Sequence, residues 1–553
     1  MDISIKKQII INTVFISWCA IIIVVGLILW RTDKLGTLFL SNIEEQRLTS
    51  IRYFKSQQII DYFKTLNDNI ANFAINTVTV EALQNFSNTF PKYLSEAKSL
   101  ATGYKSQVID KYLNDFVDKY KYYNVGKTVD AQNILNLISE QAFALQYVYI
   151  FDNPYQLSEK YKLNIVADGS QYSMMHAQYH QTMVSFKKQF GFYDIFLIDK
   201  NGNIVYTVNK EIDFTTSLVT GPYAKSNLAE LFNKVIASDK KNFIVIADFA
   251  PYLASYDNQA AFMGTAVFDK NGNKLGVVVA QLSVDILNNI MTNQGQQWEK
   301  IGLGKSINAV IVGQDLKLRN DNRFFFENKI DFLAGLKKSK FSQQLIDLIK
   351  VKNSCIGLLT TDTLAVRESL AGKEATIKYV DYRNIPVIGS FAPLAIPGLN
   401  WVIIVKINQE EAFQGIKILK QKIMHDGIWF ASVIAIIAVL LGIIIASSIV
   451  KSIYSITREL NDIAQSKDLT KRLTIQKNSE FTIMINVFNN FLDSIHHAFK
   501  NIQNSIINKL QPATQDPNSQ DQPKDLYDLV DEVQDLYKEF RIIEDQNDRI
   551  KYW

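Results

Sequence analysis

Two apolar segments without a charged residue, 8–30 and 428–450, constrain this chain more than any other feature. They read QIIINTVFISWCAIIIVVGLILW and IWFASVIAIIAVLLGIIIASSIV. A helix of about 20 apolar residues crosses the ~30 Å hydrocarbon core of a bilayer, so we expect membrane helices over 9–30 and 428–450, after a short segment 1–8. The first run exceeds the ~7–15 apolar residues of a signal peptide, and no small-residue cleavage pattern follows before Arg31. An uncleaved anchor is therefore preferred over a cleaved signal peptide or buried core helices.

The region between these segments, residues 31–427, is long enough to require a folded domain. Apolar residues make up 47% of the chain and charged residues 21%, which is typical of a folded protein. The formal net charge of +4 argues against a nucleic-acid binder. Two cysteines exclude a disulfide-built fold or a Cys-rich zinc module, and we expect Cys355 to be a buried apolar residue.

The pattern within 31–427 changes from helix to strand. Residues 41–86 lack Pro and Gly and show helical periodicity, and helical character continues to about residue 190. Two Asn-Gly pairs, in the repeated pentapeptide at 199–203 and 269–273, then separate β-rich runs and predict hairpins. Further strands are predicted in 309–318, 376–380, 387–391 and 401–407. We expect two antiparallel sheet modules, at about 180–290 and 300–410, carried on the long helix.

Several short motifs, in the same order as in a known family, occur along this region. They are 58–63 (QIIDYF), 80–83, 172–180, 190–194, 221–223, 248–252 (DFAPY), 291–294 and 397–401 (PGLNW). The region resembles a double Cache sensor domain, which implies two PAS-like sheets stacked on a long N-terminal helix. Such domains belong to bacterial transmembrane receptors whose cytoplasmic parts are chemoreceptor hairpins, histidine kinases or nucleotide cyclases. The aromatic–Arg–Trp-Tyr array of the amino-acid-binding members is not evident.

Residues 451–500, after the second apolar segment, resemble a HAMP linker. Apolar residues at 453, 456, 460 and 463 give the first seam of the expected helical bundle. Its second seam is predicted from Ile483, Val487, Asn490, Phe491 and Ile495. Two residues depart from the family, because Glu459 stands in place of Pro and Thr482 in place of Gly. The resemblance implies a cytoplasmic bundle and hence a periplasmic position for 31–427.

The C-terminal segment follows with a linker predicted at 501–525 and a heptad pattern at 526–551. The heptad residues are Leu526, Leu529, Val533, Leu536, Phe540, Ile543, Asn547 and Ile550. They predict a parallel coiled coil and a homodimer, with an amphipathic helix docked on a partner as the alternative. The residues after HAMP are too few for a kinase or cyclase domain, so we expect a receptor that lacks an output domain and is not an enzyme.

Four other motifs have ordinary explanations. Gly302–Ser306 (GLGKS) lacks the first Gly of a phosphate-binding loop, and the Asp199–Asn203 pentapeptide fits a hairpin better than a calcium loop. His176 and His180 could face one ion from a helix, but a structural or pocket-lining role is preferred. His496–His497 lacks the context of a phosphoacceptor. We expect no catalytic residue, metal or cofactor.

The overall prediction is an α+β membrane protein with two membrane helices flanking a double Cache domain. It would reside in the bacterial inner membrane as a multi-pass protein and sense a small periplasmic molecule for a cytoplasmic signalling protein, without nucleic acid. The alternatives are an output-less remnant of a kinase, cyclase or chemoreceptor, or a structural membrane-anchored binding protein. Aromatic walls with carboxylates suit a cationic or hydroxylated ligand. The resemblance to Cache domains implies that the pocket lies against the sheet of the module at about 180–290. The predicted ligand-binding residues, from the strands and loops of that module, are Tyr193, Asp194, Tyr206, Tyr223, Asp248 and Tyr252.

Overall fold

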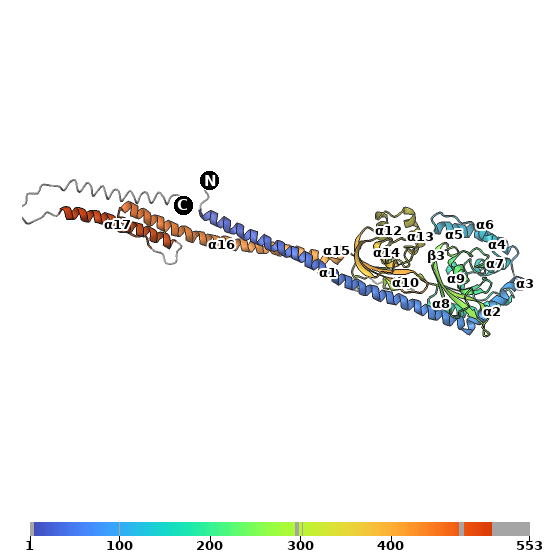
Figure 1. Cartoon of the computed structure of the whole chain (residues 1–553). Coiled ribbons are helices and arrows are strands. Elements are labelled where there is room, and N and C mark those ends of the chain that lie inside the picture. The colour runs from blue at the N-terminus through green and yellow to red at the C-terminus, as the bar shows by residue number, and fades with distance from the viewer. Residues whose placement is uncertain (1–4, 99, 294–297, 301, 475–480, 511–553) are drawn as a thin grey trace, which may run out of the picture. The chain divides into compact units, whose positions relative to one another are not determined.

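The structure, a computed structural model, mixes helices with two antiparallel sheets (Figure 1). It describes residues 5–98, 100–293, 298–300, 302–474 and 481–510. The chain divides into two units. Val24–Gly427 contains both sheets and is called the sheet unit here, and Met1–Ile23 with Ile428–Trp553 is called the helical unit.

The first helix, α1 (Ile5–Ile75), is continuous for 71 residues, so the predicted membrane helix and the predicted long helix are one element. Within the sheet unit its buried side chains recur every three or four residues, which is the stripe of a helix packed along one face. Each such fully buried side chain contributes ~1.5–3 kcal/mol. Figure 1 shows α1, in blue, extending along both sheets. The stripe consists of Ile59, Phe63, Leu66, Ile70 and Phe73.

Short helices lead from α1 to the first sheet, as the sequence predicts. The last of them, α8, begins at the cap Ser170, whose side chain accepts a hydrogen bond from the Ser173 N–H, and ends at Gly191 with φ of 69°. The elements are α2 Thr77–Thr89, η1 Phe90–Lys92, α3 Tyr93–Glu96, α4 Tyr104–Lys111, η2 Tyr112–Phe116, α5 Val117–Tyr123, α6 Ala131–Asn136, α7 Glu140–Gln146, η3 Tyr147–Phe151, η4 Leu157–Lys162 and α8 Gln171–Phe190.

The first sheet has five strands in the order β2-β1-β5-β4-β3. Both Asn-Gly hairpins are confirmed, with φ of 84° at Gly202 and at Gly272. The Asp199 carboxylate accepts hydrogen bonds from its own turn, at 2.9 Å from the N–H groups of Asn201 and Asn203, which supports a turn role over a calcium role. The elements are β1 Asp194–Asp199, β2 Ile204–Thr207, α9 Asn227–Ile236, β3 Val245–Tyr252, η5 Leu253–Ser255, β4 Asn258–Phe268, β5 Lys274–Gln281 and α10 Val284–Thr292.

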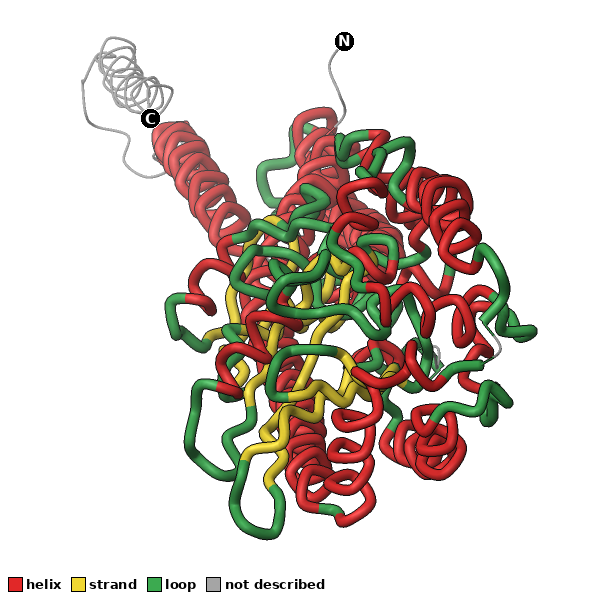
Figure 2. Tube along the Cα trace, turned by 90° about the vertical axis from the view of Figure 1, so that its right-hand side faces the viewer, coloured by secondary structure: helices red, strands yellow, loops and turns green. Residues whose placement is uncertain are grey.

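The second sheet has four strands in the order β6-β9-β8-β7, and Figure 2 shows the strands with helices and loops around them. The third strand–turn–strand pattern, expected over 309–318, is confirmed in part, because β6 ends at Val312 and Leu318 pairs back with Val312 across a turn without forming a second strand. Leu316 has φ of 64° and Leu318 forms only one isolated bridge, so the chain turns instead of pairing along its length. The elements are β6 Asn308–Val312, α11 Arg323–Glu327, α12 Lys329–Lys338, α13 Gln343–Lys352, α14 Leu364–Leu370, β7 Ala375–Val380, β8 Pro386–Leu394, β9 Trp401–Asn408 and α15 Gln409–Ala412.

The helical unit contains the C-terminal part of α16 (Gln414–Ser466) and α17 (Thr482–Leu510). These two helices and their connector share a small core. In the single chain Ile483 and Val487 are exposed while Ile485 and Leu492 are buried, so the second seam of the expected dimeric bundle stays a prediction. Helix α17 also continues through 501–510, where a linker was predicted, and the predicted coiled coil lies outside the described residues. The core residues are Ile456, Ile463, Leu473, Ile485 and Leu492.

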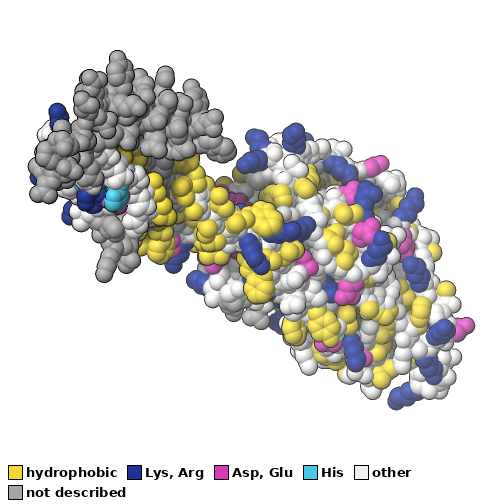
Figure 3. Space-filling view, turned by 60° about the vertical axis from the view of Figure 1, so that its left-hand side comes forward, with side chains coloured by type: hydrophobic (Ala, Val, Ile, Leu, Met, Phe, Trp, Pro, Cys, Tyr) yellow, Lys and Arg dark blue, Asp and Glu magenta, His cyan; other side chains and the backbone are white. Residues whose placement is uncertain are grey.

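Two helices are long and apolar enough to cross a membrane, and they contain the two apolar segments. Their apolar side chains are largely exposed, for example Phe15 at 67% and Ile444 at 64%. Figure 3 shows hydrophobic side chains gathered along the helical segment. Water is a poor solvent for such a surface, whereas a bilayer accommodates it.

Candidate ligand-binding site

Four of the six predicted site residues are buried in or beside the first sheet. Asp194 begins β1, Tyr206 lies on β2, Tyr252 ends β3, and Tyr223 precedes α9. The structure places them around the segment that follows β2, residues 207–217, through the contacts described below. We call this group, together with the charged residues of 207–217, the buried cluster.

Lys210 is the cation of the buried cluster. Its side chain is 1% exposed, and its ammonium donates a hydrogen bond to the carbonyl oxygen of Thr207. The ammonium lies 4.2 Å from the ring centre of Tyr206 and 4.9 Å from that of Phe214. Among the described residues it has no carboxylate within ion-pairing distance. Burial therefore lowers the pKa of Lys210, although the charge of Asp194 opposes this shift.

Glu211 and Asp213 are acidic neighbours in the same segment. Glu211 is half-buried and accepts hydrogen bonds of 2.6 Å from the hydroxyls of Tyr193 and Ser255. Asp213 is fully buried and accepts a 2.6 Å hydrogen bond from Tyr252 through Oδ2. Its other oxygen, Oδ1, has no hydrogen-bond partner. Burial raises the pKa of both carboxyl groups, and the charge of Glu211 raises that of Asp213 further.

Asp194 is held differently from the other two acids. Its Oδ1 accepts hydrogen bonds from the backbone N–H groups of Ile195 at 2.7 Å, Val208 at 2.9 Å and Asn209 at 3.0 Å. Burial raises the pKa of Asp194, while the Lys187 ammonium and the backbone donors lower it. The arrangement ties β1 to the start of 207–217, so Asp194 fixes the position of the segment that carries the other charged groups.

A pair of histidines on α8 borders the buried cluster, with ring centres 4.3 Å apart. His180 Nε2 lies 2.6 Å from the carbonyl oxygen of Tyr161, which can only accept, so Nε2 carries the proton and Nδ1 accepts from the Tyr206 hydroxyl at 2.6 Å. His176 donates from Nδ1 to the Asn164 carbonyl, which leaves its buried Nε2 unpaired. Burial and the Lys210 charge lower the pKa of both, that of His180 to about 3. Within the described residues no group of ligands suits a metal ion.

The remaining two predicted residues lie at the edge of the buried cluster or away from it. Tyr193 is 43% exposed and reaches the cluster only through its hydroxyl, which binds Glu211. Asp248 on β3 accepts hydrogen bonds from Arg319 and from Trp401 of the second sheet's region, so its carboxylate belongs to the contact between the two sheets and not to the buried cluster.

The sequence interpretation missed the charged residues of 207–217. The signal was present, because Lys210, Glu211 and Asp213 form a dense charged stretch directly after an apolar strand. A turn on the surface would explain that pattern equally well from sequence alone. The difference is burial, which arises from the packing of distant elements against 207–217, among them Tyr252, Gln146 and Tyr112.

No family model matches the chain. Among curated proteins, the methyl-accepting chemotaxis protein PctB of Pseudomonas aeruginosa is 31% identical over 139 residues, covering 22% of this chain and 21% of PctB. The methyl-accepting chemotaxis protein McpA of Pseudomonas putida is 24% identical over 259 residues, covering 46% of this chain and 34% of McpA. The chain thus spans a fifth to a third of the length of these relatives.

Solved structures similar to this chain are sensory domains of bacterial receptors. The periplasmic sensory domain of the Campylobacter jejuni chemoreceptor Tlp1 aligns with a TM-score of 0.33 and 13% identity, over 68% of this chain and 98% of that domain. The ligand-binding domain of the Pseudomonas aeruginosa chemoreceptor PctC, in complex with GABA, aligns with a TM-score of 0.27 and 12% identity, over 46% of this chain and 88% of that domain. The curated relatives are chemotaxis receptors, and the predicted resemblance of this chain to that receptor group is confirmed.

Proposed function

We propose that this chain is a dimeric inner-membrane receptor that binds a small periplasmic molecule in the buried cluster. Helices α1 and α16 would each cross the membrane once, which would place the sheet unit in the periplasm. Residues 451–500 would act as a HAMP bundle that passes the signal to a cytoplasmic signalling protein. The function is binding and transmission without catalysis.

The unpaired polar groups of the buried cluster are the observation that carries this proposal. Asp213 Oδ1, the Tyr223 hydroxyl and His176 Nε2 are buried and have no hydrogen-bond partner among the described residues. An unsatisfied buried polar group costs ~1–3 kcal/mol. Such groups are tolerated where a ligand satisfies them, and a concentration of them with perturbed pKa values is typical of a functional site.

The charges of the buried cluster define the class of ligand. Glu211 and Asp213 present carboxylates for a cationic group, and the ring of Tyr252, whose hydroxyl donates to Asp213, lies beside them. Lys210, which lacks an acidic partner among the described residues, would pair with an anionic group. A small zwitterion with an ammonium and a carboxylate, of the amino-acid class, meets both requirements.

The buried cluster is closed, since Lys210 and Asp213 are 1% and 0% exposed. A ligand can therefore enter only if 207–217 moves, and it shifts the receptor between two arrangements by its different affinity for them. A movement of the sheets would reach the membrane through α1. Phe63 of α1 packs edge-to-face against Trp401 of β9, with ring centres 5.5 Å apart.

The proposal is tested by thermal unfolding of the full chain in detergent micelles against a panel of amino acids and simple amines. At least one zwitterionic compound should raise the Tm in a concentration-dependent manner. The variant Asp213→Asn should lose that shift, while the control Asp239→Asn, whose side chain is fully exposed, should keep it. A panel without any shift, or an equal shift in Asp213→Asn, would refute the proposal.

A further inference from the structure

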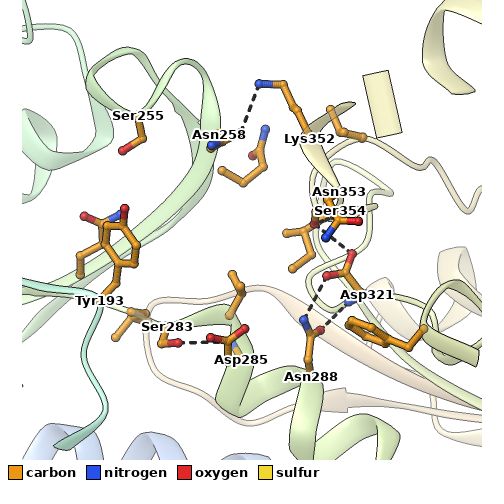
Figure 4. A pocket seen from close by; sticks show the side chains of 17 residues that line it. Tyr193, Ser255, Asn258, Ser283, Asp285, Asn288, Asp321, Lys352, Asn353 and Ser354 are labelled. Atoms are coloured by element: carbon orange, nitrogen blue, oxygen red, sulfur yellow. Dashed lines mark hydrogen bonds between the residues drawn. The ribbon is translucent and has the colours of Figure 1, made fainter. Parts of the chain in front are cut away.

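A cavity lies between the first sheet and the helices and loops around the second sheet, and it borders the buried cluster at Tyr193 and Ser255, whose hydroxyls bind Glu211 (Figure 4). Its volume is about 380 Å³, which is in the range of small-molecule sites. Figure 4 shows Tyr193 and Ser255 of the first sheet's region on one side and Asn353 and Ser354, which follow α13, on the other. Residues at the start of α10 form its base. A molecule held here would contact β4 and β5 of the first sheet and the helices and loops of the second sheet's region.

The lining is dominated by neutral amides and hydroxyls. Gln281, at the end of β5, is 6% exposed, and its side-chain amide makes no hydrogen bond to any described residue. Gln259 on β4 also lacks a side-chain partner in the described part of the chain. Each amide offers both donors and acceptors. The amide and hydroxyl residues that line the cavity are Ser255, Asn258, Gln259, Gln281, Ser283, Asn288, Asn353 and Ser354.

Two of the three charged residues that line the cavity, Asp321 and Lys352, are engaged within the protein, whereas the exposed Asp285 carboxylate has no partner among the described residues. Asp321 accepts hydrogen bonds from Asn288 at 3.0 Å, from Ser354 at 2.9 Å and from the Cys355 N–H at 2.5 Å. The Lys352 ammonium donates to the Tyr256 carbonyl at 2.9 Å and to Asn258 at 3.3 Å. Recognition therefore falls mainly to the neutral groups.

Two exposed aromatic rings complete the cavity from opposite sides. Tyr193, just before β1, is 43% exposed, and Phe326, on α11, is 51% exposed. Flat apolar rings beside amides and hydroxyls suit a molecule that has C–H faces and many hydroxyl groups. We propose that this cavity is a second ligand site, and that it takes a neutral polyhydroxylated compound of the monosaccharide class.

Helix α10 connects this cavity to the long helix. Its first residues, Val284 and Asp285, line the cavity. At its other end, the carbonyl oxygen of Ile290 and the side chain of Asn293 accept hydrogen bonds from the Lys55 ammonium of α1, the second at 2.9 Å. A ligand that moves α10 thereby moves a contact of α1. The second site is thus connected to α1 through α10, a contact that involves no residue of the buried cluster.

The experiment measures binding of neutral monosaccharides and polyols to the full chain in micelles, by thermal shift and then by titration calorimetry. At least one compound should bind. The variants Gln281→Met, which removes the free amide, and Phe326→Ala, which removes one ring, should each weaken binding roughly three- to tenfold. The control Gln107→Met, at an exposed amide of the same unit, should leave the affinity unchanged.

Two further outcomes separate this site from the buried cluster. The variant Asp213→Asn should retain the binding of the polyhydroxylated compound, even though it loses the zwitterion. The inference is overturned if no compound of the panel binds, if Gln281→Met and Phe326→Ala bind as tightly as the natural chain, or if only charged compounds show binding that depends on Gln281.

Discussion

Arg319 and Asp248 join the two sheets by a two-pronged ion pair. Arg319 donates from Nε to Oδ1 of Asp248 at 2.9 Å and from Nη2 to Oδ2 at 2.8 Å. The indole N–H of Trp401 on β9 donates to the same Oδ1 at 3.0 Å. Because the Arg319 side chain is only 3% exposed, this pair is a specific link between β3 and the region that follows β6.

The variant Asp248→Ala should destabilise the sheet unit, because it leaves a buried guanidinium and an indole N–H without their acceptor. Asp315 still pairs with Arg319, and Asp248 is itself 32% exposed, so we expect a loss of about 2 kcal/mol in the free energy of unfolding. Urea unfolding of the full chain in micelles measures it. The control Asp239→Ala should change stability by less than ~0.5 kcal/mol. Equal values for the two variants would contradict a role in joining the sheets.

The neutral state of His180 predicts a pH dependence. Its pKa is lowered to about 3 by burial and by Lys210, whereas an unfolded histidine titrates near 6.5. Between these values the unfolded chain binds a proton that the folded chain does not, so stability falls as the pH is lowered from ~6.5.

This contribution is isolated by comparing the natural chain with His180→Gln, which retains a donor for Tyr161 and an acceptor for Tyr206. The carboxyl groups of the buried cluster titrate in both chains and largely cancel in the difference. Between pH 6.5 and 4.5, stability should fall more steeply in the natural chain, by up to ~1.4 kcal/mol per pH unit. Parallel curves would show that His180 is not held neutral.

Two glycines of the sheet unit should respond to alanine in opposite directions. A Cβ at Gly264, on β4, would lie 2.8 Å from Val279 Cγ2 and 2.9 Å from the Val278 carbonyl oxygen. Because these atoms cannot all move away, Gly264→Ala should lower the free energy of unfolding by ~1–3 kcal/mol. A Cβ at Gly335, inside α12, would meet nothing within 4 Å. Gly335→Ala should therefore stabilise by ~0.5–1 kcal/mol. Chemical unfolding of both variants measures the change in the free energy of unfolding. A change of the same sign in both variants would count against the described packing.

Loss of the Lys55 contact should loosen the end of α10 more than it lowers the free energy of unfolding of the whole chain. The Lys55 ammonium joins α1 to the end of α10, and burial lowers its pKa to about 8. Lys55→Met keeps the apolar stem but removes both hydrogen bonds. We expect a change of less than ~1.5 kcal/mol in the free energy of unfolding, since burying the charge opposes the gain from the bonds. Hydrogen exchange at the end of α10 should rise in this variant, and unchanged protection would refute the link.

The local parts of the fold could be predicted from the sequence because they depend on neighbouring residues. The Asn-Gly pairs fix both hairpins, since Gly202 and Gly272 supply the positive φ that the turns require. Strand β3 was recognised only as a motif, because Pro251 interrupts its β-rich pattern. The strand tolerates that proline because it is the last strand in the order β2-β1-β5-β4-β3.

The site could be predicted only in part, because its chemistry depends on contacts between distant residues. Tyr206 and Tyr252 were identified from aromatic content, but Asp248 was grouped with them since its partner Arg319, 71 residues away, cannot be read from spacing. Lys210 and Asp213 were missed for the same reason. Their burial results from the whole sheet unit, whereas a local pattern of charges suggests a solvated turn.

The affinity of the full chain for the zwitterionic ligand found by thermal shift, measured by calorimetry in the natural chain and in Asp213→Asn, tests the central claim most directly. Loss of a charge-assisted hydrogen bond in a buried site costs ~1.5–3 kcal/mol, so the Kd should rise at least roughly tenfold. Asp239→Asn should bind like the natural chain. An unchanged Kd in a folded Asp213→Asn protein would contradict the buried cluster as the ligand-binding site.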